Sequence, residues 1–203
     1  MKLSAPLLLL SLLTAVGSGS AAAQGPLEGP GWQPLNERLP PGYNAEILRR
    51  IRSEDAIWMQ PIRVELPSTG SVAIHAGQPA PAAEATAPAA FAVGMGHLYR
   101  LRLAELPEFP AAEFYPTIEL LDRLHPPAGQ EFQHPIPILF TADDLKLAAS
   151  GALVTRVIYL ERPQTAASDD PLRRERPQTI APGDNAIAAA EMHGRPLAIV
   201  RIG

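Results

Sequence analysis

Residues 97–105 read HLYRLRLAE, a stretch in which apolar and polar side chains alternate with a period of two. This alternation is typical of a β-strand, because successive side chains of a strand point to opposite faces of its sheet. Tyr99, Leu101 and Leu103 therefore share one face, and Arg100 and Arg102 share the other. Because the two arginines indicate contact with water, we expect the Tyr-Leu-Leu face to lie in the core.

Further strand-like segments follow this stretch. Residues 115–121 and 153–161 are rich in β-branched and aromatic side chains, which favour strands. Residues 136–140 are predicted to form an edge strand, because Pro137 has no amide hydrogen to donate to a second neighbour. We expect the strand at 153–161 to pair within the same domain and to bury Val157 or Ile158.

Two hairpins are predicted at the ends of this region. Residues 62–66 and 72–75 flank a Pro-Ser-Thr-Gly turn, which is the pattern of a β-hairpin. Residues 186–192 and 197–202 lie on either side of His193-Gly194 and are predicted to form a terminal hairpin.

Two short helices are also predicted. Asn44 is placed to cap a helix that ends near Arg52, with Ile47, Leu48 and Ile51 as its apolar stripe. A disordered basic patch is the alternative for that segment. Thr141 is placed to cap a second helix, because its side chain could accept a hydrogen bond from the backbone amide three residues later. The negative charges of Asp143 and Asp144 suit the positive N-terminal end of this helix, and Gly151 ends it.

The strands are short and show no regular alternation with helices, so the sequence predicts a mainly β protein. The expected architecture is an antiparallel two-layer β-sandwich, immunoglobulin-like or transthyretin-like, with one or two short helices. It occupies residues 56–203 as one domain and follows an irregular arm at 24–55. Residues 76–90, rich in Pro and Ala, are predicted to be a loop within the domain, with an interdomain linker as the alternative. Residues 163–184 are predicted to be a mobile loop.

Five segments carry a family resemblance: GMGHLYRLRL, FYPTIELLDRLHPP, QHPIPILF, GALVTRVIYLERPQ and GRPLAIVRIG. They resemble a family of uncharacterised exported bacterial proteins. That resemblance implies export and implies no particular activity or site residues. The strand pattern of the HLYRLRL and EFYPTIEL segments is also similar to that of transthyretin-like and immunoglobulin-like sandwich modules, and this second resemblance rests on the strand pattern alone.

The N-terminal residues have the pattern of a secretory signal peptide. Lys2 is followed by an apolar run at residues 7–16, and Ala21-Ala22-Ala23 fits the small-residue rule for cleavage before Gln24. Residues 1–23 are therefore expected to be removed on export to the periplasm or the extracellular space. No later segment is long and apolar enough to predict a membrane span.

The composition excludes several classes of function. The chain has no cysteine, so it holds no thiol nucleophile and no thiolate metal site. Its net charge of −4 argues against a nucleic-acid-binding protein. No G-x-S-x-G motif and no phosphate-binding glycine loop is present. We therefore predict no cofactor.

Few residues are candidates for a site. Arg100 and Arg102 could bind an acidic partner or a sulfated or uronic glycan, although a merely hydrated face is the preferred interpretation. Three histidines could converge on a metal ion, but their spacing matches no metal motif and surface positions are the preferred interpretation, so no metal is predicted. These histidines are His97, His125 and His134.

Two smaller groups complete the candidates. Asp143 and Asp144 could instead be calcium ligands, but helix capping explains them with fewer assumptions. Three aromatic residues could stack on sugars or fill the core: Trp32, Tyr43 and Trp58.

The leading hypothesis is an exported, non-enzymatic envelope protein, a β-sandwich that binds or scaffolds another surface protein or glycan. One alternative is a secreted protein that binds a small ligand, a glycan or a metal ion. A second alternative is a secreted hydrolase with an unrecognised site, which requires a deep pocket with at least two titratable groups of perturbed pKa.

Overall fold

The computed structural model describes residues 35–163, 177–181 and 183–203. The expected signal peptide, the first part of the expected arm and most of the expected loop at 163–184 lie outside the described residues. Residues Leu35–Gly203 form one compact unit.

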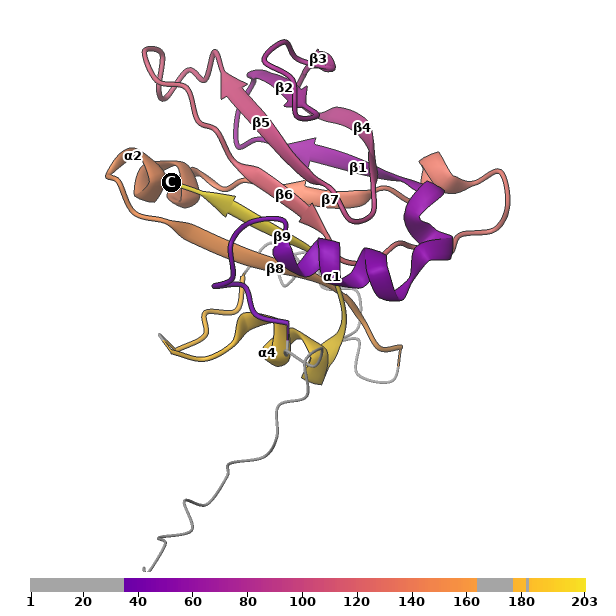
Figure 1. The fold of residues 1–203 in the computed structure, drawn as a ribbon. Helices are drawn as coiled ribbons and strands as arrows, with labels where there is room; N and C mark the ends of the chain where they lie inside the picture. Colours follow the sequence, from indigo (N-terminus) through magenta and orange to yellow (C-terminus); the bar gives the residue numbers. More distant parts are fainter. Residues whose placement is uncertain (1–34, 164–176, 182) are drawn as a thin grey trace, which may run out of the picture. The chain divides into compact units, whose positions relative to one another are not determined.

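The strands of this unit form two sheets (Figure 1). The three-stranded sheet has the order β4-β1-β7, with β1 (Met59–Glu65), β4 (Ala89–Gly94) and β7 (Ile136–Leu139). The six-stranded sheet has the order β3-β2-β5-β6-β9-β8, with β2 (Ser71–His75), β3 (Ala83–Thr86), β5 (Leu98–Ala104), β6 (Thr117–Leu120), β8 (Val154–Glu161) and β9 (Gly194–Ile202). The fold is therefore mainly β, as predicted.

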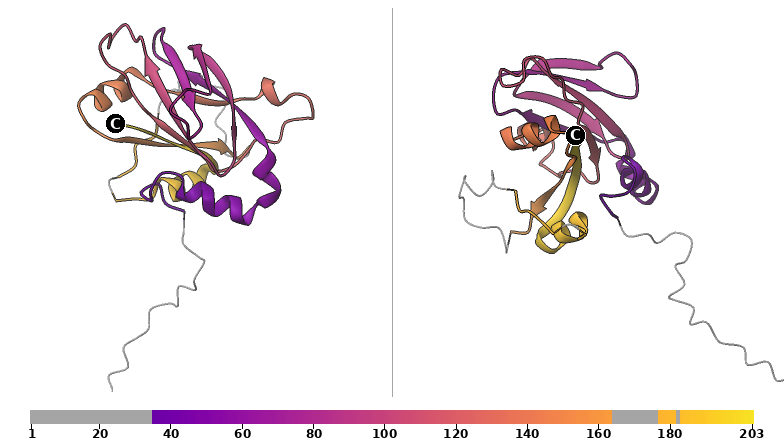
Figure 2. Two further views of the ribbon diagram at one scale, coloured as in Figure 1. Left: turned by 45° about the horizontal axis from the view of Figure 1, so that its top comes forward. Right: turned by 90° about the vertical axis from the view of Figure 1, so that its left-hand side faces the viewer.

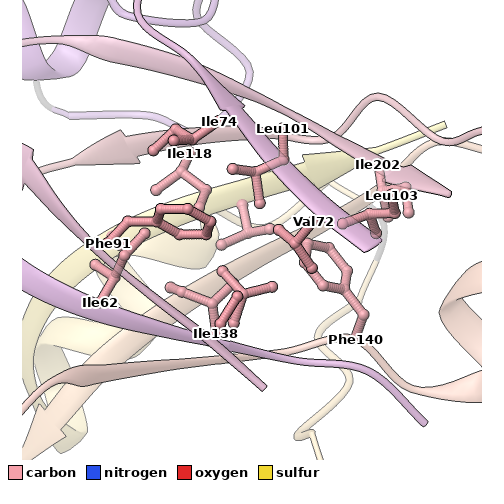
Figure 3. Close-up of a cluster of buried hydrophobic side chains, with 14 of the residues drawn as sticks. Ile62, Val72, Ile74, Phe91, Leu101, Leu103, Ile118, Ile138, Phe140 and Ile202 are labelled. Carbon is pink, nitrogen blue, oxygen red and sulfur yellow. The ribbon is translucent and has the colours of Figure 1, made fainter. Parts of the chain in front are cut away.

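The two sheets share one hydrophobic core, and Figure 3 shows side chains from both sheets turned toward each other. Ile62 and Phe91 come from the three-stranded sheet, whereas Leu101, Leu103 and Ile118 come from the six-stranded sheet. Leu101 and Leu103 are completely buried, and Tyr99 packs against the same core. The predicted facing of residues 97–105 is thus confirmed.

The other face of the six-stranded sheet is covered mainly at β6, β9 and β8, and among the described residues Gly42 also lies against Leu98 at the start of β5. Helix α4 (Ala186–His193) lies beside β8 and β9, as Figures 1 and 2 show. Ile187 of α4 packs with Ile199 and Leu121, and Leu48 of helix α1 (Tyr43–Ile51) joins this second cluster. Short 3-10 helices follow α1 at Ser53–Ile57 and precede β7 at Glu131–Gln133.

Several predicted pairings are wrong although the strands themselves exist. Residues 62–66 and 72–75 do not form a hairpin, because β1 pairs with β4 and β7 while β2 pairs with β3 and β5. Strand β7 pairs with β1 in parallel, so the three-stranded sheet is mixed and not antiparallel. β7 is an edge strand, as predicted for a strand that contains Pro137. Residues 76–90 are not one loop, since they include β3 and the start of β4.

The predicted terminal hairpin is also wrong, because residues 186–193 form helix α4. The segment reads AIAAAEMH, and alanine has the highest helix propensity of all residues. Asn185 adds a cap, since its side-chain oxygen accepts from the amides of Ile187 and Ala188. Strand β9 pairs instead with β6 and β8.

Helix α1 exists, but its cap is not Asn44. Gly42 precedes the helix with a φ of 91°, a backbone conformation that glycine adopts without strain. Asn44 lies inside the helix and is buried, where its side chain bonds the backbone of Asn36. The predicted apolar stripe is only partly correct, because Ile51 is 69% exposed.

The second predicted helix is confirmed as α2 (Ala142–Ala149). Thr141 Oγ1 accepts from the Asp144 amide at 3.2 Å, and Asp144 accepts from the Thr141 amide at 2.8 Å. This reciprocal pair is a capping box with Asp in place of Glu. Arg156 of β8 also contacts Asp144 at 2.7 Å. The prediction for 153–161 holds in its pairing, but Val157 and Ile158 are only partly buried, because β8 is an edge strand.

Candidate functional site

The part of the six-stranded sheet that carries β2, β3 and β5 presents a polar face away from the core. We call it the arginine face. Strand register places its side chains together, because residues paired across neighbouring strands point to the same side. Its members are Ser71, Ala73, His75, Glu84, Arg100, Arg102, Thr117 at the start of β6 and, from the segment before β6, Glu113 and Tyr115.

Arg102 lies at the centre of the arginine face. Its guanidinium contacts Glu84 at 3.0 Å and Glu113 at 3.2 Å. Ala73 lies between Arg102 and Glu84 in the strand register and is completely buried, so the ion pair crosses over it. Tyr115 donates a hydrogen bond to Glu113, which extends this network across the face.

The same hydrogen bonds shift two pKa values on the face. The hydroxyl of Ser71, with a smaller contribution from Arg102, lowers the pKa of Glu84 below its ordinary value. The hydrogen bond to Glu113 raises the pKa of Tyr115. Both groups are exposed, so these shifts indicate surface hydrogen bonding and not an enclosed catalytic pair.

Arg100 differs from Arg102 in having no partner in the described part of the chain. It is exposed, and among the residues that the structure describes it makes no hydrogen bond and no ion pair. A surface guanidinium on a rigid strand, with its donors unused, is available to an anionic group. The structure therefore places both arginines on one face and, within the described residues, gives ion-pair partners to Arg102 alone of the two.

Other charged groups are engaged within the fold. Glu119 of β6 is completely buried and contacts Arg201 of β9 at 2.9 Å. Glu119 also accepts from the Ala45 amide at 2.8 Å, and Arg201 donates to the Glu37 carbonyl at 2.9 Å. These contacts attach the segment before α1 and α1 itself to the outer face of the sheet.

A second polar cluster lies just beyond β6. Asp122 is buried and contacts both Arg52 at 2.9 Å and Arg195 at 3.1 Å. Nearby, Arg123 contacts Asp55 at 2.6 Å, and its guanidinium lies 4.4 Å from the centre of the Trp58 ring. Sequence reasoning missed both clusters, because their partners are far apart in the chain and follow no motif.

The remaining sequence candidates do not converge. His97, His125 and His134 are all exposed. The described part of the chain contains no group of three His, Cys, Asp or Glu side chains arranged to hold a metal ion. Trp58 is partly buried beneath Arg123 and Tyr43 is 42% exposed, whereas Trp32 lies outside the described residues. Asp143 is exposed at the start of α2.

No helix among the described residues has the length and apolar character needed to cross a membrane. Comparisons of the chain with protein-family models, with curated proteins and with solved structures found no match. The physical properties of the arginine face therefore carry the functional argument.

Proposed function

We propose that this chain is an exported, non-enzymatic binding module of the cell envelope, with the arginine face as its binding surface. Export rests on the signal-like N-terminus, in which an apolar run precedes Ala21-Ala22-Ala23. The proposed location is the periplasm or the extracellular space. The proposed partner is another component of the envelope or of the extracellular surface.

The proposal includes a two-layer sandwich of the immunoglobulin-like or transthyretin-like type. Its support is the single core to which both sheets contribute. In such a fold the strand backbone holds the side chains of an outer sheet face at fixed spacings, which suits contact with a large partner.

The observation that carries the binding proposal is the contrast between the two arginines of β5. Arg102 contacts two carboxylates, whereas Arg100, two residues away on the same face, is exposed and donates no hydrogen bond to any described residue. Arg102 and its carboxylates stiffen the surface, and Arg100 offers the unmatched charge. Electrostatic complementarity of this kind gives an interface its specificity and its association rate.

Fractionation of the native host tests this proposal. We expect Arg100→Ala to move the protein from the envelope-associated fraction to the soluble exported fraction while leaving its melting temperature unchanged. Arg63→Ala is the matched control, because Arg63 is a half-exposed strand arginine of the other sheet, with a carboxylate neighbour at 3.1 Å. Equal retention of wild type and Arg100→Ala contradicts the proposal.

A further inference from the structure

Two buried polar atoms that have no hydrogen-bond partner among the described residues flank Arg100 in the sheet. In the strand register, Arg100 of β5 is paired with His75 of β2 and with Thr117 of β6. Within the described residues, His75 Nε2 and Thr117 Oγ1 are both buried and neither has a partner. Buried polar atoms in native proteins are nearly always hydrogen-bonded, so each exception calls for a physical explanation.

The three groups form a single row across the sheet. Residues paired across antiparallel strands have Cβ atoms about 4.5–5.5 Å apart, so the row spans roughly 10 Å. Arg100 is exposed at the centre of this row, and within the described residues no hydrogen bond or ion pair holds its guanidinium. A guanidinium binds a carboxylate through two parallel hydrogen bonds, and an imidazole and a hydroxyl beside it add further donors.

The charges around this row select the kind of anion. Arg100 and Arg102 contribute two positive charges to the arginine face, and two glutamates, Glu84 and Glu113, contribute two negative charges. A densely charged polyanion would therefore meet repulsion from both glutamates. A ligand with widely spaced carboxylates and many hydroxyls would instead find one free guanidinium and two carboxylates able to accept hydroxyl hydrogens.

Tyr115 supplies an apolar surface on the same face. Its side chain is 48% exposed, and its hydroxyl is held by Glu113, so the ring has a fixed position. The face of an aromatic ring carries partial negative charge, which is complementary to the partly positive C–H groups on one face of a sugar ring. Hydroxyl acceptors, a carboxylate receptor and a ring platform together are complementary to an acidic sugar.

We propose that the row of His75, Arg100 and Thr117 is a carboxylate subsite, and that the arginine face binds an oligosaccharide containing uronic acid residues. This inference rests on the proposed function and adds the chemical class of the partner. The carboxylate of one sugar binds Arg100, with the imidazole and hydroxyl completing its shell. Neighbouring hydroxyls reach Glu84 and Glu113.

Calorimetric titration of the purified chain with defined oligosaccharides tests the ligand class. The probes are oligogalacturonate, oligomannuronate, their methyl esters and a polyglutamate peptide. We expect at least one uronate to bind, and its methyl ester to bind at least about tenfold more weakly because the ester removes the charge. Absence of binding by both uronates overturns the inference, as does tighter binding of polyglutamate, which would indicate an acidic protein partner.

Variants of the row test the subsite itself. Arg100→Ala should weaken uronate binding by at least about tenfold, and Arg100→Lys should also weaken it, because an ammonium group lacks the planar fork of a guanidinium. Arg63→Ala should leave the affinity unchanged. Full uronate affinity in Arg100→Lys would mean that the site recognises the carboxylate by its charge alone, and this would overturn the assignment of a bidentate subsite.

Thr117→Val separates binding from structure. It removes the unpartnered hydroxyl while keeping the side-chain shape, so we expect a several-fold loss of uronate affinity with an unchanged or higher melting temperature. A lower melting temperature would show that the hydroxyl has a structural partner, and this would overturn its place in the subsite. If Arg100→Ala abolishes envelope retention while no uronate binds, the ligand class is wrong and the binding face stands.

Discussion

The buried ion pair between Glu119 and Arg201 offers a quantitative test of how the outer face of the six-stranded sheet is built. Glu119→Ala removes a carboxylate that is completely buried and that accepts from two donors, the Arg201 guanidinium and the Ala45 amide. Arg201 is itself only 7% exposed, so it would remain as a buried and unpaired charge. Breaking a buried pair in this way costs about 3–5 kcal/mol of unfolding free energy.

An exposed ion pair on helix α1, the helix that Glu119 contacts through the Ala45 amide, provides the control. Glu46 and Arg50 are four residues apart on α1, with side chains 47% and 72% exposed. Water screens such a pair, so Glu46→Ala should cost only about 0.3–0.5 kcal/mol. Both substitutions are Glu to Ala and both remove a contact to α1, so the difference between their losses of unfolding free energy reports the effect of burying the ion pair.

Urea unfolding measures both variants. We expect the unfolding midpoint of Glu119→Ala to fall with little change in the denaturant slope. The double variant Glu119→Met with Arg201→Met should be more stable than Glu119→Ala, because it removes both buried charges together. A loss below about 1 kcal/mol for Glu119→Ala, or a double variant no more stable than the single one, would refute this reasoning.

Three further results follow from the core, a helix cap and a surface carboxylate. Leu101 is completely buried, so Leu101→Ala should lower the unfolding free energy by about 2–5 kcal/mol, measured in urea. Arg100→Ala should change it by about 0.5 kcal/mol or less. A larger loss for Arg100→Ala than for Leu101→Ala would show that the assigned facing of the strand is wrong. Thr141→Ala should lower stability by about 1 kcal/mol, because it removes the side-chain half of the α2 capping box, and circular dichroism melting measures this loss. The lowered pKa of Glu84 means that its ionised form stabilises the fold above the ordinary value of 4.5, and that this contribution is lost as the pH falls through the lowered pKa. Glu84→Gln should therefore lower the melting temperature slightly at neutral pH, and the difference from wild type should vanish in acid; a difference that persists in acid would contradict this origin.

Local patterns in the sequence predicted individual elements well. The period-two alternation in β5 gave the correct facing of Leu101 and Arg100, because pleating alone decides which side a strand residue faces. Thr141 and Asp144 were found because a capping box depends only on residues three apart.

The pairing of strands could not be predicted in the same way. The Pro-Ser-Thr-Gly turn after β1 favours a hairpin locally, yet β1 and β2 enter different sheets, since the shared core is filled from both layers. Helix α4 was mistaken for a strand because Gly194 and the strongly β-forming residues after it suggested a turn between two strands. Its five consecutive residues Ala186–Ala190 were the better signal, with four alanines among them.

The candidate site was predicted only in outline. The arginines of β5 were visible as an exposed pair, but their different roles depend on Glu84 and Glu113, which approach from other segments. The row formed with His75 and Thr117 depends on strand order, which a single sequence does not specify. The buried pair of Glu119 and Arg201 was missed for the same reason, because its residues are 82 positions apart.

Photo-crosslinking in the native host tests most directly whether a partner occupies the arginine face. Thr86 of β3 is exposed and lies beside Ser71 in the register, at the rim of this face, so a photoreactive residue there leaves Arg100 and its neighbours intact. We expect a photoreactive residue at position 86 to form a crosslinked adduct, and we expect the adduct to disappear when Arg100→Ala is added. A photoreactive residue in place of Arg63, on the other sheet, should form no adduct. An adduct from position 63 with none from position 86 would contradict the claim that the arginine face is the binding surface.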